Sequence, residues 1–156
     1  MAVLMKILIL LLTLAYGIYG NNYLFLMEKE LNEIELESKI VAKIAQDLVG
    51  QNEVKVYLTH YNIEEQEAYK KFINITSHCV EADIIFLKKN KTLDSSCEGL
   101  NKIILTNSYQ QFVEDDTIIG AFFWAKARPN IVFSKNRLKQ NNITLPQSYN
   151  QFIEDL

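Results

Sequence analysis

The chain has 156 residues, a formal net charge of −3 and 49% hydrophobic residues. This mild acidity argues against nucleic-acid binding, which needs a basic surface, and against attachment to anionic lipid through a polybasic segment. The apolar content is sufficient for a packed core, and no low-complexity segment indicates disorder, so we expect one globular domain.

The first 20 residues have the features of a secretory signal peptide. Lys6 is the only charge, and it precedes an apolar run over residues 7–16. Small residues follow at Gly17 and Gly20, and either could end the cleaved segment. The run is short for a transmembrane helix, although an uncleaved N-terminal anchor is the alternative. We predict a periplasmic protein, exported by residues 1–20 and not inserted in the membrane after cleavage.

Residues 21–50 carry the pattern of a long amphipathic helix. Apolar or small residues recur in alternating steps of three and four, the a/d spacing of a heptad. Gly50 is a suitable helix stop, and the glutamates of the first half read as a solvated face that suits the helix dipole. The narrow first half of the stripe suits pairing with a partner, and an ordinary core-facing helix throughout is the alternative. The stripe consists of Leu24, Met27, Leu31, Ile34, Ser38, Val41, Ala45 and Leu48.

Residues 51–156 alternate between short apolar strands and helical segments. Strands are predicted over 54–59, 82–87 and 102–106. Asn62 and Glu65 have capping-box spacing at the start of a helix between the first two strands. This alternation predicts a single α/β domain, with a mainly parallel sheet and flanking helices.

The last third contains a predicted antiparallel hairpin. Its strands, 117–124 and 130–133, are joined by a connection too short for a crossover helix. Trp124, Lys126 and Arg128 lie around this connection, and Trp and Arg are enriched in protein interfaces. These three residues are therefore a candidate interface. The alternative is that Trp124 ends a core strand and the cations only solubilise the turn.

Two C-terminal segments resemble each other. Residues 108–115 and 148–155 each place Ser and Gln at capping-box spacing, followed by an aromatic and aliphatic stripe. Both are predicted to be helices that pack against the sheet in the same way. A further helix is predicted to begin near Ser134.

Cys79 and Cys97 are the only cysteines. In an oxidising compartment such a pair usually forms a disulfide, which would stabilise the fold by about 3 kcal/mol. Two buried free thiols are the alternative. Neither histidine lies in a cluster with metal-ligand spacing, so no metal or other cofactor is predicted.

No motif for catalysis is present. The chain has no Gly-x-Ser-x-Gly elbow, no Cys-x-x-Cys pair and no glycine-rich phosphate loop, so we predict a non-enzyme. Thr59, His60 and Thr106 would lie at the carboxyl ends of strands, where ligands bind in open α/β sheets. A small solute-binding module is therefore kept as an alternative to protein binding.

The order of elements in the C-terminal part is informative. Cys79 precedes an apolar strand, a second strand ends in Leu105-Thr106, and a hairpin containing Trp124 leads into a helix. In this order residues 52–156 resemble the YfiR-like family of small periplasmic α/β proteins. The resemblance implies a disulfide-stabilised, non-catalytic protein that binds the periplasmic part of a membrane diguanylate cyclase and holds it inactive. The long acidic helix in front departs from that pattern.

A second resemblance lies in the amino-acid composition of the chain. The chain is rich in Lys, Asn and Ile, and in this it is similar to small exported proteins of Campylobacter-like bacteria, some of which are accessory parts of the periplasmic scaffold of the flagellar motor. We predict a periplasmic adaptor or scaffold protein that binds another cell-envelope protein. The predicted contacts are the stripe Leu24, Met27, Leu31 and Ile34, and a second surface at Trp124, Lys126 and Arg128.

Overall fold

The computed structural model describes residues 33–156. The chain divides into two compact units, residues 1–36 and residues 37–156. Of the first unit only residues 33–36 are described, and they are helical. The predicted signal peptide and the stripe residues Leu24, Met27 and Leu31 lie outside the described residues and stay predictions. Within residues 33–156 no helix is long and apolar enough to cross a membrane.

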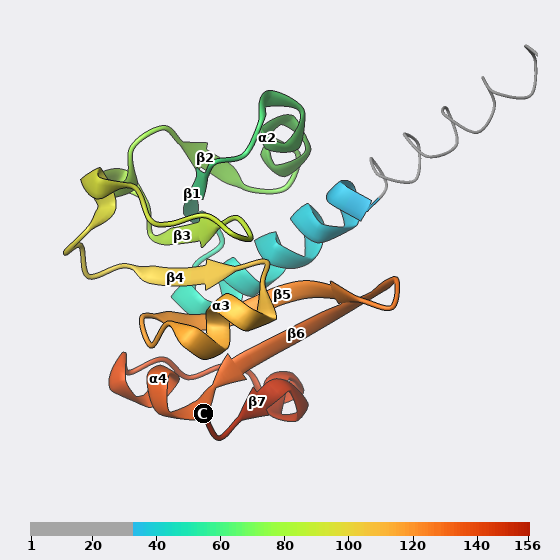
Figure 1. Ribbon diagram of the computed structural model, residues 1–156, viewed down its shortest axis with the longest axis vertical. Coiled ribbons are helices and arrows are strands. Elements are labelled where there is room, and N and C mark those ends of the chain that lie inside the picture. The colour runs from blue at the N-terminus through green and yellow to red at the C-terminus, as the bar shows by residue number, and fades with distance from the viewer. Residues whose placement is uncertain (1–32) are drawn as a thin grey trace, which may run out of the picture. The chain divides into compact units, whose positions relative to one another are not determined.

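The second unit is built on one seven-stranded sheet with the order β2-β1-β3-β4-β5-β6-β7 (Figure 1). Every neighbouring pair is parallel except β5 and β6, which form an antiparallel hairpin. The predicted fold class is therefore confirmed. The strands are β1 (Lys55–Thr59), β2 (Asn74–Thr76), β3 (Ile84–Leu87), β4 (Ile103–Thr106), β5 (Ile118–Ala125), β6 (Arg128–Ser134) and β7 (Ile153–Glu154).

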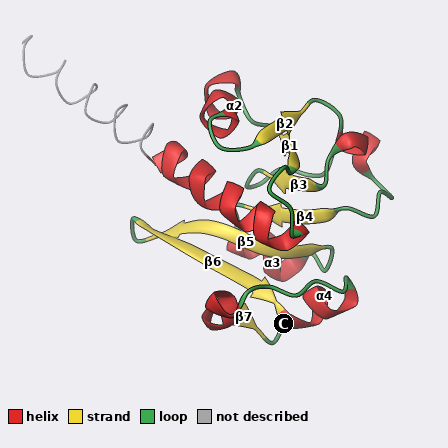
Figure 2. Cartoon of the chain, turned by 180° about the vertical axis from the view of Figure 1, so that it is seen from behind, coloured by secondary structure: helices red, strands yellow, loops and turns green. Residues whose placement is uncertain are grey.

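Helices cover both faces of the sheet. The N-terminal helix, described over 33–49, crosses one face along residues 37–49, and α3 (Tyr109–Glu114) lies on the opposite face (Figure 2). The other α-helices are α2 (Ile63–Lys70) and α4 (Lys135–Gln140), and short 3-10 helices span Cys79–Glu81, Ser95–Cys97 and Gln147–Phe152.

Side-chain alternation along the strands produces two apolar layers. Val56, Leu58 and Phe86 face the N-terminal helix, which buries Val41 and Ala45 against them. The predicted stripe therefore packs on its own sheet over the second half of the helix. Tyr57, Ile85, Leu87, Ile104 and Val132 belong to the other layer, which α3 closes with the fully buried Phe112.

Several predicted caps are present. Asn62 and Glu65 form a complete capping box at the start of α2, and the side chains of Ser108 and Ser134 accept backbone N–H groups at the starts of α3 and α4. Each cap stabilises its helix by roughly 1 kcal/mol, because it satisfies a donor that has no partner within the helix.

The predicted helix over 148–155 is wrong. Residues Gln147–Phe152 form a 3-10 helix, and Ile153–Glu154 continue as strand β7. Ile153 pairs with Phe133 and Glu154 pairs with Ser134, so this segment supplies backbone hydrogen bonds to the otherwise open edge of β6. Only the first of the two similar segments is an α-helix, because tertiary pairing overrides local propensity in the second.

The hairpin connection is shorter than predicted. Arg128 and Pro129 belong to β6, where Pro129 pairs with Trp124, and the turn itself consists of Lys126 and Ala127. The short edge strand β2 was not predicted, because its three residues carry no readable alternation.

The absence of a side chain at Gly120 of β5 leaves room for the ring of Phe133 on β6. Gly120 lies opposite Phe133, and a Cβ atom on Gly120 would come within 2.4 Å of the Phe133 ring. A larger residue at this position would displace a fully buried ring, so glycine is required by close packing.

A buried arginine joins α4 to the opposite layer. The Arg137 side chain donates to the carbonyl oxygens of Phe112 (2.6 Å) and Ile118 (2.7 Å) and lies over the Phe112 ring. It also pairs with Asp116, whose side chain is 98% exposed, so that ion pair contributes little. The main stabilising role of Arg137 is therefore to satisfy two carbonyls where α3 ends and β5 begins.

Substituting Arg137→Met should destabilise the fold. The variant keeps the apolar stem but removes the donor, which costs about 1–3 kcal/mol for each buried carbonyl left without a partner. Urea unfolding should show a lower midpoint with an unchanged slope. Lys139→Met on the exposed side of the same helix is the matched control, and it should change the unfolding free energy by less than about 0.5 kcal/mol. Equal effects of the two substitutions would contradict this role.

Candidate functional site

The outer half of the β5–β6 hairpin forms a two-stranded arm, which we define as residues 122–125 and 128–131. The last β4 pair with β5 is Thr106 with Ala121, and β7 pairs only with Phe133 and Ser134. Within the described chain the strands of the arm therefore pair only with each other. The arm reaches beyond the end of β4 (Figure 1).

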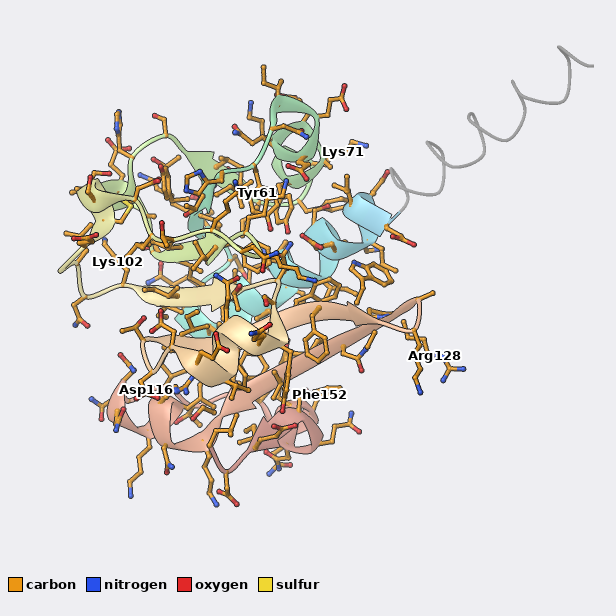
Figure 3. The ribbon with its side chains drawn as sticks, viewed as in Figure 1. Tyr61, Lys71, Lys102, Asp116, Arg128 and Phe152 are labelled. Carbon is orange, nitrogen blue, oxygen red and sulfur yellow. A yellow bond between two sulfur atoms is a disulfide. The ribbon has the colours of Figure 1, made fainter. Side chains whose placement is uncertain are left out.

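The tip of the arm is a strained cationic turn. Lys126 and Ala127 have φ values of 51° and 57°, a left-handed conformation that a two-residue hairpin turn requires but that Asn and Gly normally supply. Lys126 and Arg128 are exposed, and Arg128 lies at the outer end of the arm (Figure 3). Neither forms an ion pair with any residue from 33 to 156. The fold thus presents two cations on a turn of defined shape.

Trp124 lies further back on the arm and faces the core. Its ring packs edge-on against Phe122, with 5.8 Å between the ring centroids, and it is half-buried beside the layer under the N-terminal helix. The three predicted interface residues are therefore close in sequence but do not form one surface. Lys126 and Arg128 form the tip, and Trp124 anchors the arm.

Trp124 belongs to a cluster around a buried carboxyl group, Glu37, which is only 7% exposed. Tyr69 donates its hydroxyl to Glu37 Oε1 at 2.7 Å, and Tyr61 donates to the same oxygen at 3.4 Å. The Trp124 side chain also favours the ionised form of this carboxyl group and so lowers its pKa. Both tyrosine rings pack on Phe86 of β3, at 5.8 and 5.9 Å between centroids.

Burial dominates the electrostatics of this cluster. Desolvation raises the pKa of Glu37, the hydrogen bonds from Tyr69 and Tyr61 and the Trp124 side chain oppose that rise, and the nearby charge of Glu65 adds to it. Burial also raises the pKa of Tyr61 and of Tyr69 well above the usual range, so both phenols keep their protons and act as donors. Glu65 is itself paired with Lys88 at 2.6 Å.

Glu37 was not predicted as a functional residue, because it lies in a run of glutamates that reads as a solvated face. The position of Glu37 along the helix could have indicated that its side chain is buried. Glu37 follows Ile34 by three residues and precedes Val41 by four, so it lies on the same helix face as the apolar stripe. The half-buried Ile34 is the one predicted N-terminal contact residue within the described chain.

A second polar group lies at the carboxyl end of β1. His60 has a φ of 64°, and its Nε2 lies 3.3 Å from Asp94 Oδ1. Asp94 Oδ2 accepts the hydroxyl of Tyr57 at 2.6 Å, which raises the pKa of Tyr57 to about 12. A left-handed histidine is an uncommon conformation that costs free energy, and such residues concentrate at functional positions.

The threonines at this edge differ. Thr106 donates to the carbonyl of Leu87 at 2.9 Å and is bonded to Gln111. The Thr59 hydroxyl is buried and has no hydrogen-bond partner within the described chain. In the order β2-β1-β3-β4-β5, the chain connects outward to one side of β1 and then to the other, so the switch point of the topology lies between β1 and β3. Ligands bind at such switch points in open α/β sheets. No group of three His, Cys, Asp or Glu side chains in residues 33–156 is arranged to hold a metal ion.

Cys79 and Cys97 form a disulfide, with 5.6 Å between their Cα atoms. Both cysteines are buried, at 3% and 1% exposure, and they join two short 3-10 helices under the layer that contains Phe112. The chain-entropy model assigns about 3 kcal/mol to a loop of this length. The bond also restrains the segment that carries Asp94, three residues before Cys97. A disulfide fits an exported protein.

Comparisons with known proteins define the fold and leave the activity open. No family model matches the chain, and no curated protein matches it. A solved structure, a conserved domain protein from Vibrio cholerae, is similar with a TM-score of 0.53 over 74% of this chain and 10% sequence identity. The chain spans 58% of the length of that protein. At this identity the similarity shows the fold alone.

Burial of Glu37 predicts a particular pH dependence of stability. Because the folded chain raises the pKa of Glu37 above its ordinary value of 4.5, it binds more protons than the unfolded chain above pH 4.5. The stabilising contribution is fully present below that pH and is lost as the pH rises through the folded pKa. The unfolding free energy of the parent chain minus that of Glu37→Gln should therefore fall as the pH rises.

Urea unfolding of both proteins across this pH range measures the difference. Glu64→Gln makes the same substitution at an exposed position of α2 and is the matched control, and the pH dependence for Glu37→Gln should exceed that for Glu64→Gln. A difference for Glu37→Gln that rises with pH would show that hydrogen bonding outweighs desolvation at Glu37.

Proposed function

We propose that this chain is a non-catalytic adaptor or scaffold protein of the periplasm that binds another cell-envelope protein through the tip of the arm. The observation that carries the proposal is the strained turn bearing the exposed Lys126 and Arg128. The N-terminal stripe Leu24, Met27, Leu31 and Ile34 is proposed as a second contact, through helix pairing.

The tip has properties that suit recognition of a protein. A two-residue turn restricts the backbone, so little conformational entropy is lost when a partner binds. Arginine is common among residues that dominate binding energy. Because the tip is cationic on a chain with a net charge of −3, we propose an acidic surface on the partner and association that weakens with salt.

Export to the periplasm is proposed from two features. Residues 1–20 have the composition of a signal peptide, and Cys79 and Cys97 form a disulfide, which persists in oxidising compartments. Two partners are compatible with the sequence resemblances. Deleting an accessory part of the flagellar motor would impair motility, whereas deleting a YfiR-like regulator would change cyclic-di-GMP levels.

Reversing the charge of the tip should abolish binding of the partner. In cells that make the full chain, Lys126→Glu/Arg128→Glu should reduce crosslinks between the arm and its envelope partner at least tenfold, because attraction becomes repulsion. Crosslinking followed by mass spectrometry measures this loss. The melting temperature should be unchanged, because both side chains are exposed.

Lys89→Glu/Lys91→Glu is the matched control, since it makes the same change of net charge at exposed positions after β3. It should leave the crosslinks in place. Equal crosslinking in the arm variant and the parent chain, or equal loss in both variants, would overturn binding through the tip.

Solute binding at the carboxyl end of β1 is the second candidate. The unpartnered Thr59 hydroxyl and the strained His60 favour it. If it is correct, a small polar solute in a thermal-shift screen should raise the melting temperature, and His60→Ala should abolish that rise. Retention of the rise in His60→Ala would place the solute elsewhere.

A further inference from the structure

We propose that residues 88–94, which we define as the strap, cover a binding site for a small neutral solute rich in hydroxyl groups, at the carboxyl ends of β1 and β3. The proposal deepens the second candidate function, solute binding at the end of β1, and rests on it. It does not depend on a partner that binds the tip of the arm. The observation that carries it is the unpartnered hydroxyl of Thr59 beneath the strap.

Thr59 lies in a row of side chains that crosses three strands. It pairs with Leu87 of β3, which pairs with Thr106 of β4, so the three side chains lie on one face of the sheet. Both threonines are fully buried. Thr106 donates to the Leu87 carbonyl, but Thr59 Oγ1 is the one buried side-chain oxygen or nitrogen in residues 33–156 without a hydrogen-bond partner. Because such a group destabilises a fold, this oxygen is suited to a hydrogen bond with a ligand.

The strap passes over this row. Asp94, at the end of the strap, accepts the Tyr57 hydroxyl at 2.6 Å, and its other carboxyl oxygen lies 3.3 Å from Nε2 of His60. Tyr57 and His60 lie on either side of Thr59 in sequence, and Tyr57 shares its face of the sheet. Leu93 packs against the same apolar layer as Tyr57. The strap therefore covers the Thr59 side chain.

The middle of the strap is held by side chains and not by strand pairing. The backbone N–H groups of Lys89 and Asn90 donate to side-chain carbonyls, those of Asn107 and Gln111 respectively. The Gln111 amide also donates to the carbonyl of Lys91 at 2.7 Å. The three strap residues are exposed, so water competes for these bonds and each contributes little to stability. The strap can therefore open without disturbing the sheet.

Both ends of the strap are anchored. Cys97 follows Asp94 by three residues and is joined to Cys79 by the disulfide. At the other end Lys88 comes directly after β3 and is paired with Glu65 of α2 at 2.6 Å. Opening is therefore confined to the segment between two fixed points, as in a lid that closes over a bound solute.

The polar groups at this end of the sheet suit a solute with several hydroxyl groups. Gln111 has an amide that can both donate and accept, and its Oε1 lies 3.2 Å from the Thr106 hydroxyl. Asp94 has a carboxylate that accepts from neighbouring hydroxyls, and the Thr59 hydroxyl can donate or accept. Solute hydroxyl groups, which also donate and accept, match this mixture.

The charges around the site disfavour an ionic solute. Lys88 is paired with a glutamate of α2, and His60 lies beside Asp94. The remaining lysines of the strap, Lys89 and Lys91, are exposed to water. A buried ion of either sign would therefore lack a free buried partner of opposite charge to replace its hydration. A neutral solute avoids this cost.

Thr59→Val tests the buried hydroxyl and preserves the fold. The variant keeps the shape of the side chain and removes an unpaired polar group, so the melting temperature of the solute-free chain should be unchanged or higher. Neutral sugars (glucose, galactose and ribose) should raise the melting temperature of the parent chain by roughly 3–6 °C at ten times the dissociation constant. Thr59→Val should weaken sugar binding about tenfold or more, because the solute loses its buried partner.

Thr144→Val, at an exposed position outside the strap, is the matched control and should bind the sugars as the parent chain does. Glucuronate and glucosamine carry opposite charges on the ring of glucose, and both should raise the melting temperature less than glucose does. A lower melting temperature of solute-free Thr59→Val would show that the hydroxyl already has a structural partner, and would overturn the proposal. No rise with any neutral sugar, or a larger rise with a charged one, would also overturn it.

Hydrogen exchange of the whole chain tests the strap. A solute beneath the strap stabilises its closed form, so the sugar with the largest effect, at ten times its dissociation constant, should slow exchange of the Lys89 and Asn90 amides about tenfold. The amides of Lys126 and Ala127, in the arm, should be unchanged. A raised melting temperature with unchanged exchange in the strap would place the sugar outside it and overturn the proposal.

Failure of this site and failure of the wider proposals are distinguishable. A rise in melting temperature that His60→Ala abolishes and Thr59→Val retains would leave solute binding at the end of β1 in place and overturn the site beneath the strap. Loss of crosslinks after charge reversal of the tip concerns binding by the arm alone.

Discussion

Burying Glu37 is the constraint on which much of this structure depends. A carboxylate that leaves water costs several kcal/mol unless hydrogen bonds replace its hydration. Here the replacements come from Tyr61 and Tyr69, which lie just before α2 and within it, distant from Glu37 in sequence. The N-terminal helix and α2 must therefore both be in place before the carboxyl group is satisfied. This requirement specifies their arrangement more than apolar packing would, because apolar contacts are not directional.

Arg137 has the corresponding role on the other side of the sheet. Its buried guanidinium group satisfies two backbone carbonyls, at the end of α3 and the start of β5. Neither buried group has a buried partner of opposite charge, since Asp116 is exposed and Glu37 is hydrogen-bonded by neutral phenols. Arg137 organises the start of β5, and Glu37 joins the N-terminal helix to α2.

Function has to be argued from these local features, because a shared fold does not determine what a protein does. The similarity to the Vibrio cholerae structure concerns the sheet and its helices. Within residues 33–156, residues other than glycine and asparagine adopt left-handed conformations at two places, the tip of the arm and the carboxyl end of β1. At the tip the side chains are exposed and cationic, which suits a macromolecular surface. At β1 they are largely engaged with each other, through Asp94.

Much of the fold could be predicted because local patterns and the tertiary structure agree. The alternation of apolar strands and capped helices specified a parallel sheet with a terminal hairpin, and the caps at Asn62, Ser108 and Ser134 are local hydrogen bonds that need no tertiary context. The segment over 148–155 shows where this reasoning ends. Its sequence resembles that of α3, yet its last residues pair with the open edge of β6 and form a strand.

The candidate site divides in the same way. The sequence by itself determined that Lys126 and Arg128 lie at a hairpin tip and that Cys79 and Cys97 are suited to a disulfide, because turn length and cysteine pairing are visible in one dimension. Only the tertiary structure decided that Trp124 faces the core and that Glu37 is buried, although it lies in a sequence segment rich in glutamates that reads as a solvated face. Burial of a charge depends on donors distant in sequence, and no local pattern records which distant groups will meet.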